Sequence, residues 1–203
     1  MSDSSRLAIC FLQRLASQAD ALAGDLQEES LSGRSASWVW RQVIVAVVVS
    51  ACRDLGHHPL LALSAVIVGY ATSWVCVQLT APLRRVLNGW VLDQLIISVG
   101  SHPFVMLWAT DLHNYPVTII AGTASGWVVG RLHREHGSMV FVFATAMSLR
   151  ALFWALSVAL IPWTTMPGYI NLPAPLFTVL SNTFMPPMCI LCGGLYGLRV
   201  RRE

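Results

Sequence analysis

Residues 60–79 read LLALSAVIVGYATSWVCVQL, a run of 20 residues without a charged side chain. An α-helix rises about 1.5 Å per residue, so this run reaches about 30 Å, which is the thickness of the hydrocarbon core of a bilayer. The run therefore predicts a transmembrane helix, and it decides the class to which the chain belongs.

Three further long apolar stretches are expected to span the membrane, at residues 115–132, 139–161 and 174–198. The chain as a whole is 55% hydrophobic and only 11% charged, whereas soluble domains carry about 25% charged residues. Its 203 residues suit one compact bundle. We therefore expect an all-α polytopic integral membrane protein, a bundle of four transmembrane helices embedded in the lipid bilayer.

Two weaker apolar stretches leave a six-span alternative open. Residues 38–52 reach only about 22 Å as a helix, short of a bilayer core of about 30 Å, and the sequence Arg53-Asp54 with His57, His58 and Pro59 is expected to break the helix there. We interpret this stretch as an interfacial helix. Residues 90–109 contain Asp93, Gly100, His102 and Pro103, which favour an extracytoplasmic or interfacial segment. Inserting both stretches gives six spans.

The basic residues predict the orientation. All 13 are Arg, and Arg-rich loops stay in the cytoplasm. Four spans with a cytoplasmic N-terminus leave only Arg84 and Arg85 outside, with Arg150 inside a span. We expect a multi-pass cell-membrane protein with both termini cytoplasmic. No dense Lys/Arg run is present, so a nucleic-acid partner is not expected.

The chain divides into three parts on this basis. Residues 1–35 form a cytoplasmic amphipathic helix followed by a break of small residues, SLSGRSAS at 30–37. The helix is indicated by apolar residues recurring every three or four positions between residues 7 and 26. Residues 36–58 form the interfacial helix, and residues 59–203 form the transmembrane bundle.

Glycines repeat at helical spacing on two of the expected spans. Gly122, Gly126 and Gly130 fall on one helix face, and Gly193 and Gly197 repeat the spacing on the last span. A face without side chains lets a second helix approach closely. The spacing predicts helix packing within the bundle, with homodimerisation as the alternative.

Arg150 lies near the centre of the third span, where an Arg costs about 2.5–3.5 kcal/mol on insertion scales. Asn182 on the last span is a candidate partner. Pro186 and Pro187 remove the hydrogen bonds to the carbonyls of Asn182 and Thr183, four residues earlier. We expect Arg150 to cap this broken turn, either as a structural lock or as a site for an anion or headgroup.

Other motifs do not support catalysis. His133, Glu135 and His136 lack the HExxH spacing of zinc enzymes and a third ligand, so a solvated loop is expected. Cys189 and Cys192 form CxxC inside an apolar span, which favours buried thiols. No Walker A, HExxH or GxSxG motif occurs. The sequence therefore predicts no enzyme and assigns no catalytic, cofactor or metal residues.

The N-terminal segment contains GDLQEE at residues 24–29 and GRSASWVWRQV at residues 33–43. These two stretches resemble the permease prefix domain of acidobacterial and related bacterial membrane proteins. Residues 126–134, GWVVGRLHR, resemble a block in the small stand-alone members. The resemblance implies a bacterial inner-membrane location and association with a permease system. Because a permease core is not expected in these 203 residues, transport activity is not carried over from the resemblance. It rests on Gly24, Asp25, Glu28, Glu29, Gly33, Arg34, Trp38, Trp40 and Arg41.

This segment also has a physical interpretation. The carboxylates of Asp25, Glu28 and Glu29 are expected to pair with Arg34 and Arg41 across the small-residue break. Exposed pairs of this kind contribute little stability, so they would position the segment.

The leading functional prediction is a non-enzymatic membrane module that assembles with itself or with a partner permease. The runner-up is a small transporter or channel for an anionic or amphipathic solute, using Arg150 and the Pro-broken last helix. A membrane-embedded enzyme would require metal at His133 and His136.

Overall fold

The computed structural model describes residues 3–16, 19–99, 103–160 and 174–199, and all regular structure in these residues is α-helical. The predicted all-α class is thus confirmed. Seven helices occur in the described part of the chain: α1 (Asp3–Leu15), α2 (Ala19–Leu31), α3 (Ala36–His57), α4 (Pro59–Val99), α5 (Pro103–Leu132), α6 (Ser138–Leu160) and α7 (Ala174–Arg199).

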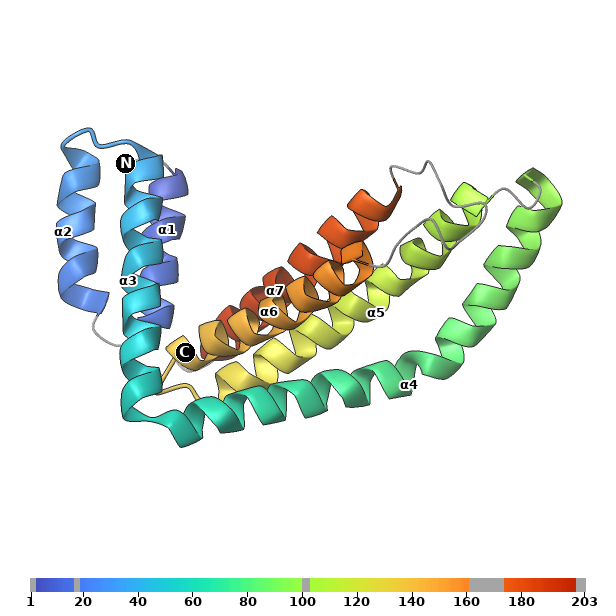
Figure 1. The fold of residues 1–203 in the computed structure, drawn as a ribbon. Helices are drawn as coiled ribbons and strands as arrows, with labels where there is room; N and C mark the ends of the chain where they lie inside the picture. The colour runs from blue at the N-terminus through green and yellow to red at the C-terminus, as the bar shows by residue number, and fades with distance from the viewer. Residues whose placement is uncertain (1–2, 17–18, 100–102, 161–173, 200–203) are drawn as a thin grey trace.

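The first three helices form an N-terminal unit, in which helices consecutive in sequence run antiparallel, so that α1 and α3 run parallel (Figure 1). Its core contains Leu12, Leu26 and Val43, all buried. The single amphipathic helix expected across residues 7–26 is wrong, because α1 ends at Leu15 and α2 begins at Ala19. Two shorter helices can fold back and bury their apolar faces against each other and α3, which one straight helix cannot do.

Helix α3 is longer than its apolar stretch. It is N-capped by Ser35, whose hydroxyl accepts a hydrogen bond from Trp38 N at 3.3 Å. It ends where His58 N donates to Asp54 O at 2.8 Å. The helix continues through Arg53 and Asp54, where a break was expected, and ends at His57, before His58 and Pro59. With 22 residues, about 33 Å, α3 thus matches the predicted helix over residues 36–58.

Helices α4 and α5 form a long antiparallel hairpin (Figure 1). They contain 41 and 30 residues, so the expected spans 60–79 and 115–132 are parts of longer helices. The described residues of the 90–109 stretch fall in two helices, since α4 ends at Val99 and α5 begins at Pro103. Proline is favoured at the first position of a helix. The number of membrane spans, four or six, stays a prediction.

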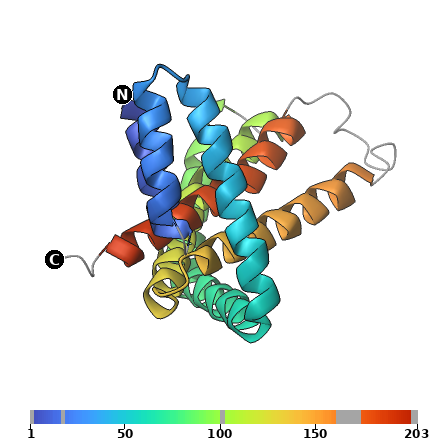
Figure 2. The same ribbon diagram turned by 90° about the vertical axis from the view of Figure 1, so that its left-hand side faces the viewer.

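Helices α4 to α7 form a bundle whose described core includes Val129, Phe143 and Ile190, each almost fully buried. Gly69 makes room for the Phe143 ring: a Cβ built on Gly69 would lie 2.5 Å from Phe143 Cζ. Figure 2 shows the N-terminal unit standing across one end of this bundle.

Among the described residues, two helical stretches are long and apolar enough to cross a membrane: α3 and the Pro59–Pro82 part of α4. Shorter apolar helical stretches occur at Ser138–Phe153 and Thr183–Leu198. Helix α3 runs at a steep angle to the bundle helices (Figure 1). Because of this angle, α3 and the bundle cannot both run along one membrane normal.

Candidate functional site

The predicted glycine face of α5 lies against α7. Gly122, Gly126 and Gly130 are all buried. A Cβ added to Gly122 would lie 2.8 Å from the Cβ of Cys189, and one added to Gly126 would overlap the carbonyl oxygen of Ile190. These glycines therefore bring the two helix backbones together.

The glycines of α7 complete this contact, which we call the glycine seam: Gly122, Gly126, Gly130, Gly193 and Gly197. A Cβ on Gly193 would overlap the carbonyl oxygen of Thr123, and one on Gly197 would lie 2.7 Å from that of Trp127. The seam is occupied within the chain, so it is not an open face for a second copy.

A further glycine, which the sequence analysis did not single out, extends the seam to a third helix. The carbonyl oxygen of Gly194 lies 2.6 Å from where a Cβ of Gly130 would be, and a Cβ on Gly194 itself would overlap Val140 of α6. The adjacent pair Gly193-Gly194 is the sequence signal that indicates contacts on two sides of α7.

Arg150 is exposed on α6, and its guanidinium carbon lies over the Tyr70 ring of α4, 5.1 Å from the ring centroid. The structure thus places it against α4 and not at the prolines of α7, which corrects the expected capping. The reason is helical periodicity: Arg150 comes seven residues, or about two turns, after Phe143, and Phe143 faces Gly69 of α4.

Helix α7 continues through Pro186 and Pro187, so the last helix is not interrupted there. The prolines still have no N–H to donate to the carbonyls of Asn182 and Thr183. The carbonyl oxygen of Pro186 would lie 3.3 Å from a Cβ of Gly122, which places the prolines beside the glycine seam. Thr183 is partly buried, and the side chain of Asn182 lies outside those that the structure describes. The expected polar cluster around Arg150 includes Asn182 and therefore stays a prediction.

The segment between α2 and α3 holds one of the expected ion pairs. Arg34 Nε donates to Glu29 Oε2 at 3.0 Å, and the Arg34 guanidinium lies 5.5 Å from the Trp38 ring centroid. This Glu29–Arg34 pair is confirmed. Both side chains are exposed, so the pair is worth about 0–1 kcal/mol. Gly33 makes the reversal possible with a φ of 99°.

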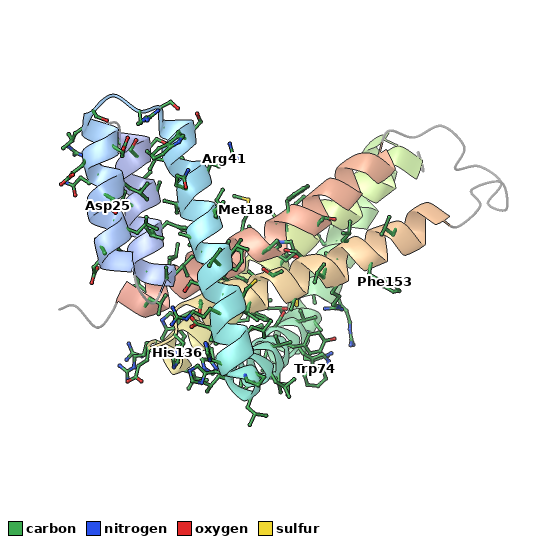
Figure 3. All side chains as sticks on the ribbon, turned by 60° about the vertical axis from the view of Figure 1, so that its left-hand side comes forward. Asp25, Arg41, Trp74, His136, Phe153 and Met188 are labelled. Atoms are coloured by element: carbon green, nitrogen blue, oxygen red, sulfur yellow. The ribbon has the colours of Figure 1, made fainter. Side chains whose placement is uncertain are left out.

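The other residues of the prefix-like segment are distributed over the N-terminal unit. Figure 3 shows Asp25 on α2 and Arg41 on α3 projecting from opposite sides of the unit, so they do not form the expected pair. Gly24 and Glu28 are exposed on α2. Trp40 has a structural contact, since its Nε1 donates to Ser4 Oγ at 3.0 Å and ties α3 to α1.

A polar junction joins the N-terminal unit to the bundle. Ser138 Oγ, at the start of α6, donates to Asp54 Oδ2 of α3 at 2.5 Å, and both residues are buried. Nearby, the ring centroids of His58 and His136 lie 5.0 Å apart. Figure 3 shows His136 at the end of the bundle beside the C-terminal part of α3. Sequence reasoning missed the Asp54–Ser138 bond because 84 residues separate the partners.

His133 belongs to the same end of the bundle. Its Nε2 lies 3.4 Å from Ser64 Oγ, which itself donates to Leu61 O at 2.8 Å. Partial burial, together with the charge of nearby His136, lowers the pKa of His133 below its usual value of 6.5. Within the described residues no group of three or more His, Cys, Asp or Glu side chains is arranged to hold a metal ion.

Comparison of the chain with family models, with curated proteins and with solved structures finds no match. Similarity therefore assigns neither a family nor an activity to the chain. The resemblance of its N-terminal segment to the permease prefix domain stays a prediction.

Proposed function

We propose that this chain is a multi-pass protein of a bacterial inner membrane, in which α4 to α7 cross the bilayer, and that it is a non-enzymatic module that assembles with another membrane protein. In this proposal the N-terminal unit lies on the cytoplasmic face, both termini are cytoplasmic, and α3 lies along the membrane surface.

The outer surface of the bundle supports this placement. Large apolar side chains face outward along the helices, among them Ile67, Trp74, Phe153 and Met188. The steep angle of α3 supports an interfacial position, because exposed apolar residues such as Ile44, Val45 and Val48 could then enter the headgroup region.

The position of Arg150 on the outside of α6 carries the assembly proposal. Arg150 is the thirteenth of the 23 residues of α6, about 18 Å from the start of the helix. Exposure of a central Arg to lipid costs about 2.5–3.5 kcal/mol on insertion scales. The Tyr70 ring offsets about 0.5–2 kcal/mol of this. Contact with another protein would supply the remainder.

The transporter alternative has less support. The glycine seam closes the space between α5 and α7, and α7 is continuous through its prolines. A midplane site between broken helices, which many transporters use, therefore has no counterpart at this position.

The assembly proposal can be tested by extracting the protein from cells in native lipid nanodiscs and weighing the particles by native mass spectrometry. We expect complexes that contain more protein than one 22.2 kDa chain, and we expect Arg150→Leu to reduce them. Met188→Ala, on the exposed surface of α7, is the matched control and should leave them intact. Particles that hold a single chain and no other protein would refute the proposal.

A further inference from the structure

We propose that the surface around Arg150 binds a transmembrane helix of another protein that carries an Asp or Glu side chain at mid-bilayer depth. We call this surface the Arg150 face: Tyr70 and Trp74 of α4 with Leu149, Arg150 and Phe153 of α6. The inference rests on the proposed membrane function, and it names the chemistry of the partner.

The Arg150 face is outward-facing and mostly apolar. Phe153 is 74% exposed, Leu149 62% and Trp74 56%. Trp74 and Phe153 project from the same flank of the bundle (Figure 3). A guanidinium surrounded by large apolar groups can be screened from water when a helix covers them, and this is the setting in which a charge pair is strongest.

Lipid is a poor partner for the guanidinium of Arg150. Acyl chains offer no hydrogen-bond acceptor to a guanidinium. Snorkelling to the headgroups is the behaviour of Arg side chains near helix ends, whereas Arg150 has 12 residues of α6 before it and ten after it. The Tyr70 ring also holds the guanidinium against α4.

A second copy of the chain does not provide a counter-charge for Arg150 either. The expected spans 60–79, 115–132, 139–161 and 174–198 contain no Asp or Glu. A two-fold contact through this face would bring two Arg150 side chains toward each other without a counter-charge at that depth. Like charges repel strongly in a medium of low dielectric constant, so self-association through this face is disfavoured.

A carboxylate fits the chemistry that remains. A guanidinium that lies over an aromatic ring still presents N–H donors in its own plane, and a carboxylate accepts two of them side by side. Complementary charge also gives specificity, because a helix without the carboxylate would leave Arg150 buried and unpaired. The face thus selects an acidic transmembrane helix over an apolar one.

The test uses the purified full chain in phosphatidylcholine liposomes at pH 8, with a donor fluorophore on the protein. The probe is a synthetic poly-leucine transmembrane peptide that carries an acceptor fluorophore and one central Asp. Peptides with Leu or Asn at the centre, and one with Asp near an end, are the controls. Energy transfer measures binding. We expect the central-Asp peptide to bind at least about tenfold more tightly than the all-Leu peptide.

Variants show whether the guanidinium is responsible. Arg150→Leu should abolish the preference, and Met188→Ala should preserve it. Because Arg150→Leu could alter folding, a charge exchange provides the second variant: Arg150→Glu should lose the Asp peptide and gain affinity for a peptide with a central Arg. Equal binding of the Asp and Leu peptides, or an unchanged preference in Arg150→Leu, overturns the inference.

Two further outcomes separate this inference from the proposed function. If no peptide is preferred but native nanodiscs still contain a second membrane protein, the acidic partner is wrong and the assembly function stands. If transfer depends on the fraction of anionic lipid and not on the peptide charge, a headgroup occupies the face and the inference is overturned. Single chains in native nanodiscs refute the assembly function independently.

Discussion

The glycine seam makes the sharpest prediction, through the substitution Gly126→Ala. An alanine Cβ at this position would overlap the carbonyl oxygen of Ile190. That oxygen belongs to the backbone of α7, so it cannot move aside as a flexible side chain can. The two helices must separate along the seam, which also loosens the contacts of Gly122 and Gly130.

The size of the effect follows from two opposing terms. Overpacking a tight core costs about 1–3 kcal/mol, and the upper end applies because the obstacle is main chain. Replacing Gly by Ala inside a helix gains about 0.8–1 kcal/mol. We expect a net loss of about 2 kcal/mol for Gly126→Ala. On the scale of soluble chains of this size, 1 kcal/mol corresponds to about 2–4 °C in Tm, so Tm should fall by about 4–8 °C.

The matched control is Gly89→Ala. Gly89 lies in α4, and a Cβ added there meets no atom within 4 Å, so only the propensity gain remains and Tm should rise slightly. The assay heats detergent-purified protein and follows the loss of its monodisperse peak in size-exclusion chromatography. The reasoning is refuted if Gly126→Ala is as stable as the unmodified protein, or if its Tm is raised as that of Gly89→Ala is.

Three further predictions concern the junction and the turn before α3. Ser138→Ala leaves the buried carboxylate of Asp54 without its hydroxyl donor, and we expect a loss of about 1–3 kcal/mol in thermal unfolding. The lowered pKa of His133 means that the unfolded chain takes up a proton more readily than the folded one. The stability that neutral His133 contributes is therefore fully present above a pH of about 6.5 and declines as the pH falls below this value. His133→Asn should make the free energy of unfolding depend less on pH in this acidic range. Gly33→Ala forces an L side chain at a φ of 99° and should cost about 1 kcal/mol, whereas Gly24→Ala, which meets no atom within 4 Å, should not destabilise the protein.

Each of these has an outcome that contradicts it. An unchanged Tm for Ser138→Ala would show that Asp54 finds another donor. A stability profile that is equally steep in His133→Asn would assign the pH dependence to other groups. A Gly33→Ala protein as stable as Gly24→Ala would show that the turn can change its backbone conformation without cost.

Much of the local structure could be predicted from the sequence. Long apolar runs indicated the all-α class, and the repeats at Gly122 and Gly193 indicated close helix contact. The pair Glu29–Arg34 was predictable because its members lie five residues apart. Each of these features involves residues close together in the sequence, and local backbone geometry is enough to relate their positions.

The functional surface could not be predicted in the same way. Sequence reasoning placed Arg150 at the prolines of α7, because depth in the membrane was the only coordinate available. Depth does not specify direction around a helix axis, and the contact between Phe143 and Gly69 is what turns this side of α6 toward α4.

The sequence by itself determined that the chain is helical and apolar, where its charges fall, and which helix faces lack side chains. Only the tertiary structure decided that residues 90–99 and 103–109 belong to two helices, that Asp54 meets Ser138, and that Arg150 faces outward over Tyr70. The physical reason is that hydropathy and helical periodicity are properties of a segment. The choice of partner instead depends on how side chains far apart in the chain fill space together.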